Sequence, residues 1–414
     1  MSTPQTTPSA LAVAAATDAD WDDIFTTDAR AFLFTDPLSE AERVDMRNKV
    51  ANADVVLVRD EAGLVPRPLV GVSMFYRMQM TVPGGTAHDA AGLSWVSVAA
   101  THRRRGILRT MITEIFDRWE NEGQLFAILT ASEATIYERF GFGPACFARD
   151  ISIDLAAAKM RARADRDTSP VNYATADDVA QRIPDLHARW VATRPGALSR
   201  SATWWEPILA DRATQRPAHQ SGRHYLIHPD GYAAYRIDQS VSPARAMVEE
   251  VFAVTNEAHT DLWRVLVGLD LLPTVTAAIP FDDPLRYKLT DHRAVSVTGI
   301  SDKMWLRILD VPRALGARHY ASDLDAVIEV TDDFRGRGGV FDVSIRNGGA
   351  IVAPSTAAPT VRMDISVLGS IYLGGVPART FAAAQRLWTD TPETLTALDA
   401  AFTTEAAPFA GTFF

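Results

Sequence analysis

Residues 96–119 constrain the fold more than any other stretch, because they combine a short strand, a basic turn and an amphipathic helix in that order. Val96 and Val98 alternate with small residues, which is typical of a buried strand. After the turn, the apolar residues recur at the spacing of one helical face, namely Ile107, Leu108, Met111, Ile112, Ile115, Phe116 and Trp119. The segment therefore predicts a strand joined by a turn to a helix.

The turn itself, Arg103-Arg104-Arg105-Gly106, has the properties of a pyrophosphate site. A helix that begins at a turn directs free backbone N–H groups and its positive end toward one point. Arginines add forked donors, and a glycine lets the backbone approach a phosphate without an intervening side chain. The alternative is an ordinary basic turn of an α/β protein, since P-loop and dinucleotide-binding fingerprints need more glycines than this.

The turn resembles the acyl-CoA-binding turn of the GNAT N-acetyltransferases, whose pattern is Arg/Gln-x-x-Gly-x-Gly/Ala or a close variant. It departs from that pattern at one place, because residues 104–109 contain a single glycine, Gly106. That departure and the sequence ASEATIYERFGFGPA at residues 131–145 narrow the resemblance to the Eis (enhanced intracellular survival) acetyltransferases. The resemblance implies an enzyme that uses acetyl-CoA.

Length and composition exclude several other classes. A chain of 414 residues with 47% hydrophobic and 22% charged residues has room for more than one core. No apolar run approaches the ~20 residues of a membrane span, and a net charge of −10 argues against nucleic acid while permitting a polycationic partner. The single cysteine, Cys146, excludes a disulfide framework and a multi-cysteine metal site. We expect a cytoplasmic protein with no metal and a short mobile N-terminal tail.

The first region, residues 1–158, is predicted to contain the elements of a GNAT fold in the order α, α, β, β, β, α, β, α, β. Ser132 is expected to cap the helix that carries Tyr137, and Gly141 to end it. The other expected elements are helices within residues 17–34 and 38–50, and strands within residues 53–60, 70–82, 94–98, 125–131 and 149–155.

A degenerate repeat defines the second region, residues 159–297, which opens with a helix and linker at residues 156–172. Residues 251–266 align without a gap with residues 96–111, but Ala258, His259, Thr260 and Asp261 stand where the arginine turn stands. A carboxylate in place of the glycine would repel pyrophosphate and block its approach. We interpret the region as a second GNAT-like domain without cofactor binding; chance similarity of two strand–helix units is the alternative.

The third region, residues 298–414, mixes helices with strands cut by Gly, Asn-Gly and Gly-Gly turns. Helices are expected within residues 300–317, 377–388 and 392–402, and strands within residues 326–333, 339–354 and 361–375. This pattern resembles the sterol-carrier-like C-terminal domain of the Eis family. The whole chain is thus predicted to be α+β (α/β), with two tandem GNAT-like domains followed by a sterol-carrier-protein-like domain.

The resemblance also implies the active-site residues. Tyr137 would be the general acid that protonates the departing thiolate, with a structural tyrosine as the alternative. The Phe414 α-carboxylate would reach the acetyl-transfer site, and the aromatic residues of the last segment are expected to anchor it. The implied cofactor-binding residues are Val96, Ser97, Val98, Arg104, Arg105, Gly106, Ile107, Leu108, Arg109, Ser132 and Glu133.

Acceptor recognition is less specified by the sequence. Acidic and aromatic residues can bind ammonium groups, and the candidates for a polyamine cleft are Asp28, Asp36, Trp21, Phe34 and Trp95, with a core role as the alternative for Trp21 and Phe34. His102 is expected to be a surface-loop residue and not a base. Some Eis relatives carry an acidic residue where this chain has Phe413, which suggests a different acceptor range or regiochemistry.

The predicted function is acetyl-CoA-dependent N-acetyl transfer to amines of aminoglycoside-type polyamines, in a protein that forms a homohexamer by resemblance. The alternatives are a protein or peptide lysine N-acetyltransferase and a non-catalytic lipid-carrier or interaction protein. The charge of the arginine turn argues against the last, because nothing structural requires it there. The sequence does not specify the physiological acceptor, the number of acetylations or a lipid.

Overall fold

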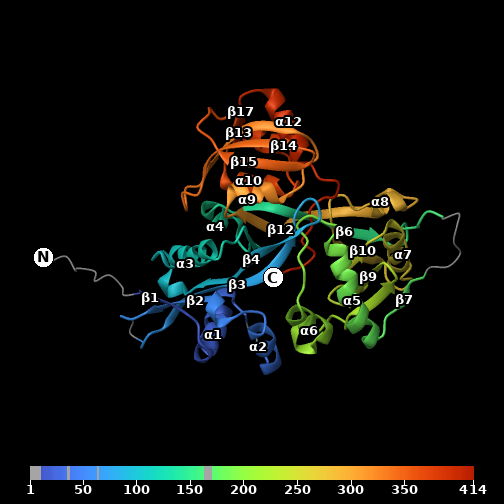
Figure 1. Cartoon of the computed structure of the whole chain (residues 1–414). Helices are drawn as coiled ribbons and strands as arrows, with labels where there is room; N and C mark the ends of the chain where they lie inside the picture. Colours follow the sequence, from blue (N-terminus) through green and yellow to red (C-terminus); the bar gives the residue numbers. More distant parts are fainter. Residues whose placement is uncertain (1–10, 35–37, 63–64, 163–169) are drawn as a thin grey trace. The chain divides into compact units, whose positions relative to one another are not determined.

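A ladder of five strands, β1-β2-β3-β4-β5, forms the sheet of the first structural unit (Figure 1). The computed structural model describes residues 11–34, 38–62, 65–162 and 170–414. This unit comprises the residues up to Arg77, Ala90–Leu129 and Phe414. β1 and β2 pair antiparallel, as do β2 and β3, whereas β4 and β5 pair parallel. The strands are β1 (Leu11–Ala15), β2 (Val55–Asp60), β3 (Leu69–Thr81), β4 (Ala87–Val98) and β5 (Phe126–Leu129).

Three helices cover the two faces of this sheet, with α3 (Ile107–Asn121) on the face opposite α1 (Trp21–Phe32) and α2 (Glu40–Arg47) (Figure 1). α2 begins with a capping box in which Ser39 and Glu42 satisfy each other's backbone N–H groups. The buried face of α3 is the stripe read from the sequence, apart from the half-buried Leu108. The prediction of a strand, a turn and a helix at residues 96–119 is therefore confirmed.

The second unit contains a mixed sheet in the order β12-β6-β11-β10-β9-β8-β7. β6 lies between β11 and β12 and pairs antiparallel with both, so the strand expected to close the first region is held by strands from later in the chain. The elements are β6 (Gly143–Asp154), β7 (Asn172–Tyr173), β8 (His224–His228), β9 (Gly231–Asp238), β10 (Arg245–Ala253), β11 (Thr274–Ile279), β12 (Val295–Ile308), α5 (Ala176–Val191), α6 (Ala202–Ala210), α7 (Asn256–Val267) and α8 (Leu285–Lys288).

The predicted repeat is present as a strand and a helix, β10 and α7, but the turn differs from the one expected. Thr255 caps α7, and its side chain accepts from the backbone N–H of Ala258. The residues aligned with the arginine turn, 258–261, therefore lie inside a helix. The second copy lacks the turn altogether, and Asp261 is a buried residue of α7.

The last part of the second unit contains a separate five-stranded sheet in the order β15-β14-β13-β16-β17. β13 and β16 pair parallel, and the other neighbours pair antiparallel. Around it lie α9 (Val311–Ala317), α10 (Ile365–Tyr372), α11 (Ala378–Ala383) and α12 (Pro392–Phe402). The strands are β13 (Leu324–Thr331), β14 (Gly339–Arg346), β15 (Gly349–Pro354), β16 (Val361–Asp364) and β17 (Leu387–Thr389).

Several local predictions were wrong. Residues 11–15, assigned to the tail, form β1, because their backbone pairs with β2. The helix expected from residue 300 is the continuation of β12 as far as Ile308, and this strand crosses the expected domain boundary at residues 297–298. Residues 365–372, expected as strand, form the fully buried helix α10, which the Asp364 side chain caps.

Two further predictions were wrong, one on the cap of the helix that carries Tyr137 and one on the linker at residues 156–172. α4 (Ala134–Tyr137) begins after Glu133 without a side-chain cap, so Ser132 does not cap it, although Gly141 does end the following turn in a left-handed conformation. The described part of residues 156–172 contains a turn and the β-bridge Met160–Leu289 instead of a helix, and residues 163–169 lie outside the described residues. Within the described ranges, no helix is both long and apolar enough to cross a bilayer.

Candidate active site

The arginine turn has the backbone geometry of an anion site. Arg104 and Gly106 both adopt left-handed conformations, with φ of 64° and 81°. Gly106 is the N-cap residue of α3, whose first turn contains no acidic residue. A Cβ atom built on Gly106 would meet nothing within 4 Å, so the space above this helix end is open. A left-handed, exposed position with free space beside it suits glycine and leaves the backbone accessible to a ligand.

The charges of the turn lie at the surface. Arg103, Arg104, Arg105 and Arg109 are all exposed. Within the described part of the chain, Arg103 and Arg104 form no ion pair, and Arg105 is 3.9 Å from the Asp60 carboxylate. Ile107 differs from this group, because its side chain is 1% exposed and packs against Gly71, so only its backbone is available at the turn. A diphosphate would thus be bound by the arginines and by backbone N–H groups.

β4 extends past the end of β5 directly before the turn. The parallel ladder between them runs from Ala90–Phe126 to Leu93–Leu129 and includes no later pair. Trp95, two residues further on, has φ of 52°, a conformation that costs a large side chain about 1–3 kcal/mol. The ladder ends at Leu93, so the backbone of Val96 and Val98 continues beyond the carboxyl end of β5. Ligands bind at such ends in parallel sheets.

Ser97 is placed differently from its neighbours. Its side chain is buried, and its hydroxyl donates to the Asp28 carboxylate at 2.8 Å. Only the backbone of Ser97 can therefore contact a cofactor. Asp28 lies on α1 and is 6% exposed, and burial raises its pKa to about 6 although the Ser97 bond opposes the shift. Sequence reasoning found no side-chain base in this region, because burial of a carboxylate cannot be read from its local sequence.

The structure brings some of the acceptor candidates together. Phe25 contacts both Trp21 and Trp95, with ring centroids 5.5 and 5.9 Å apart. Trp21 is a core residue, 4% exposed, whose indole N–H donates to Asn52. Phe34 is 64% exposed and stacks on Phe32 instead of joining this group.

The remaining acceptor candidate, Asp36, lies outside the described residues. His102 is held by Asp60, since its Nε2 is 3.0 Å from that carboxylate. The half-buried imidazole is therefore engaged with a carboxylate next to the arginine turn.

Tyr137 lies in the second unit at the end of α4. Its side chain is 6% exposed and packs edge-on against Phe142, with ring centroids 6.3 Å apart. Burial, with a smaller contribution from the charge of Glu133, raises the pKa of its phenol to about 12. The phenol is therefore protonated at neutral pH, as a general acid must be before it acts.

The turn after Tyr137 is fixed by a buried ion pair. Arg307 donates to the Phe140 carbonyl at 2.8 Å and pairs with Asp332 at 2.7 Å, with both charged side chains 1% exposed. A paired, buried arginine of this kind holds the turn rigidly. Ser132 and Glu133, at the start of α4, are exposed and available to a ligand.

The C-terminal segment is docked on the second unit. Phe409 N–H donates to the Pro195 carbonyl, and Leu198 N–H donates to the Ala410 carbonyl, both at 3.0 Å. Phe409 also contacts Trp190, with ring centroids 6.4 Å apart. Phe413, expected as an aromatic anchor, is instead 80% exposed. Backbone pairing and polar contacts thus anchor the tail more than the expected aromatic cluster does, and the half-buried Phe414 is grouped with the first unit.

Family models match the chain in three consecutive segments. Two acetyltransferase (GNAT) domain models match residues 12–145 and 196–308, and a sterol carrier protein domain model matches residues 311–411. These matches define an acetyltransferase with two GNAT domains followed by a sterol carrier domain. They also confirm the predicted α+β fold class with its sterol-carrier-like end.

Whole-chain comparisons specify the family. The N-acetyltransferase Eis of Mycobacterium tuberculosis is 38% identical over 395 residues, which cover 94% of this chain and 96% of the relative. An N-acetyltransferase of Streptomyces coelicolor, described as uncharacterized, is 30% identical over 94% of this chain and 96% of its own length. The crystal structure of Eis1 from Mycobacterium abscessus superposes with a TM-score of 0.84 and 30% identity, covering 97% of this chain and 100% of that one. The chain belongs to the Eis family of N-acetyltransferases.

Proposed function

We propose that this protein transfers the acetyl group of acetyl-CoA to amines of aminoglycoside-type polycations, at one or several positions. The observation that carries the proposal is the open arginine turn at the N-terminus of α3, with two left-handed residues and exposed arginines. Nothing in the packing of α3 requires that charge, whereas a CoA diphosphate does. The residues that the family resemblance assigns to the cofactor lie in three places. These are the arginine turn, the part of β4 beyond its ladder with β5, and the exposed start of α4.

We assign Tyr137 and Phe414 distinct catalytic roles. The Tyr137 phenol donates a proton to the departing thiolate, and its raised pKa of about 12 keeps it protonated until that step. The Phe414 α-carboxylate accepts the proton that the acceptor ammonium must lose before it can attack, directly or through a water. An α-carboxylate has a pKa of about 3.5 in water, so it acts as a base only where it is partly desolvated or held close to the amine.

We assign acceptor binding to the α1 side of the first unit. Asp28 supplies a buried carboxylate next to β4, and Trp95 supplies an aromatic face, a combination that suits an ammonium group. The net charge of −10 favours the approach of a polycation. By resemblance we further propose a homohexamer in the cytoplasm, which fits a chain whose single cysteine, Cys146, is buried and free.

Mass spectrometry of kanamycin or tobramycin after incubation with the protein and acetyl-CoA tests the proposal. We expect mass increments of one or more acetyl groups that require both protein and acetyl-CoA. A lysine-containing peptide in a parallel reaction distinguishes the runner-up, peptide lysine acetylation. Acetylation of the peptide and not of the aminoglycosides would overturn the proposed acceptor class.

A further inference from the structure

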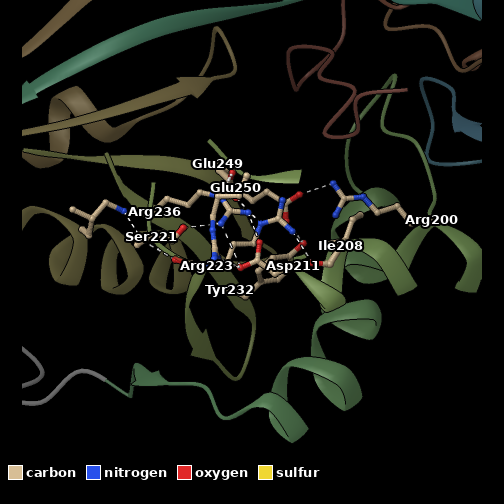
Figure 2. A network of polar contacts seen from close by, with 12 residues as sticks. Arg200, Ile208, Asp211, Ser221, Arg223, Tyr232, Arg236, Glu249 and Glu250 are labelled. Carbon is tan, nitrogen blue, oxygen red and sulfur yellow. Dashed lines mark hydrogen bonds and ion pairs between the residues drawn. The ribbon is translucent and has the colours of Figure 1, made fainter. Parts of the chain in front are cut away.

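The second GNAT-like domain carries a network of ion pairs whose members range from buried to exposed (Figure 2). Arg223 and Arg236 both pair with Glu249, at 2.6 and 2.7 Å, and Arg236 also pairs with Asp211. The third arginine, Arg200, pairs with Glu250 at 2.6 Å. Figure 2 shows Arg200 at the edge of this network. Its guanidinium has N–H donors besides the one that bonds Glu250.

Those donors bind the end of the chain. Arg200 Nε donates to the Thr412 hydroxyl at 3.0 Å, and its Nη2 donates to the Gly411 carbonyl at 2.8 Å. The Arg200 side chain is 3% exposed, and its guanidinium lies 4.8 Å from the ring centre of Trp205. A buried guanidinium must have its charge and its N–H groups satisfied. Glu250 neutralises the charge, and the tail accepts from Nε and Nη2, while Nη1 is buried without a hydrogen-bond partner among the described residues.

Gly411 and Thr412, the two tail residues that Arg200 bonds, are also held by their own surroundings. Gly411 has φ of 67°, and a Cβ atom there would lie 2.6 Å from the Trp190 ring, so the position admits only glycine without rearrangement. Thr412 is 7% exposed, and its hydroxyl lies 3.4 Å from the Leu198 carbonyl. Glu250 is held in turn by the Tyr232 hydroxyl at 2.8 Å. The tail is thus fixed to within two residues of the terminus.

We infer that Arg200 is a positioning residue for acetyl transfer, which clamps Gly411 and Thr412 so that the Phe414 α-carboxylate is presented at a fixed point. Two residues reach at most about 7 Å beyond a clamped residue, so the carboxylate searches a small volume. A base held in this way acts at a high effective concentration, whereas an unclamped tail disperses it. The second GNAT-like domain, which lacks the phosphate turn, serves here as the docking surface for the catalytic tail. This inference rests on the proposed function.

The test compares four variants of the full-length protein. Arg200→Gln removes the clamp, and Thr412→Val removes one of its acceptors in case the buried arginine is needed for folding. Thr412→Ser keeps the hydroxyl and serves as the rescue. Arg189→Gln removes an exposed arginine of the same domain, paired with Asp230 at 2.6 Å, and serves as the control. Hydrogen exchange of residues 409–414 measures docking, and steady-state kinetics separate kcat from the KM for acetyl-CoA.

We expect faster exchange of the tail in Arg200→Gln and Thr412→Val, with kcat lower by about 10- to 100-fold in Arg200→Gln and an unchanged KM for acetyl-CoA. Thr412→Ser and Arg189→Gln should match the wild type in both measurements. Unchanged tail exchange in Arg200→Gln, or a released tail with wild-type kcat, would overturn the inference. A wild-type protein that transfers no acetyl group would overturn the proposed function instead, and the exchange measurement would still decide whether Arg200 clamps the tail.

Discussion

Tyr137 and Asp28 are both ionisable groups whose pKa values are raised by burial, with different consequences at neutral pH. The phenol, with a pKa of about 12, stays protonated, whereas the carboxyl, with a pKa of about 6, exchanges its proton close to physiological pH. Neither property follows from residue type, because the shift depends on how completely each side chain is desolvated. At neutral pH the phenol therefore has a proton to donate, whereas the carboxyl can bind a proton or release it.

Tyr137→Phe should lower kcat by about 10²- to 10⁴-fold, the range for loss of a positioned general acid. Acetyl-CoA affinity should change little, because the ring and its contact with Phe142 remain. Pre-steady-state kinetics and calorimetry with CoA give the two quantities separately. A variant with the wild-type rate would reduce Tyr137 to a packing residue.

Asp28 should make the stability of the protein depend on pH. Its pKa is about 6 when folded and 3.8 as a free side chain, so the folded state holds the proton more tightly. The stability this gives is complete below the unfolded pKa and is lost as pH rises through the folded pKa. Relative to Asp28→Asn, the wild type should lose up to about 3 kcal/mol in the free energy of unfolding as pH rises, mostly between the unfolded pKa of 3.8 and the folded pKa of about 6. Urea unfolding at a series of pH values measures it, and parallel curves for the two proteins would contradict the shift.

At the scale of elements, the arginine turn owes its geometry to the helix that follows it. The stripe of apolar residues fixes which face of α3 is buried, and Gly106 at its N-cap leaves the arginines exposed. The copy in the second domain shows the converse, since α7 begins at Asn256 and no turn remains. The residue at which the helix begins thus decides whether the turn is present.

Arg104→Gln should weaken CoA binding by about 10- to 150-fold, since a charge-assisted hydrogen bond to phosphate contributes roughly 1.5–3 kcal/mol. The salt dependence of binding should also decrease. Arg118→Gln is the matched control, because Arg118 lies in the last turn of α3 and pairs with Glu114 at 3.1 Å. Calorimetry at two salt concentrations measures both effects. Equal affinities for the two variants would place the diphosphate elsewhere.

The elements that the sequence predicted well are those with a strong local period. α3 and α12 lie where their patterns indicated because one face of each is buried, and β2 and β3 lie at the expected apolar runs although both of their faces are buried. α10 was misread as a strand because it is apolar on every side, and a fully buried helix has no period. The pairing of β6 with β11 and β12 could not be predicted either, since register between distant strands leaves no local signal.

At the scale of the whole molecule, the chain uses its two GNAT-like domains differently. The first retains the turn suited to CoA, and the second has lost that turn and holds the C-terminal tail through Arg200 and backbone pairing. A catalytic role for the tail was predicted only from the family resemblance. The residues that hold it, 200 and 250, were invisible to sequence reasoning because an arginine and a glutamate without a motif look like surface residues.

Replacing the Phe414 carboxylate by a carboxamide through semisynthesis tests whether that carboxylate acts as the base, since it removes one charge and leaves every side chain in place. The account predicts that kcat for aminoglycoside acetylation falls by about 10²-fold or more, while affinity for CoA and the exchange protection of the tail stay at the level of the carboxylate form. A carboxamide enzyme with unchanged kcat would contradict the account.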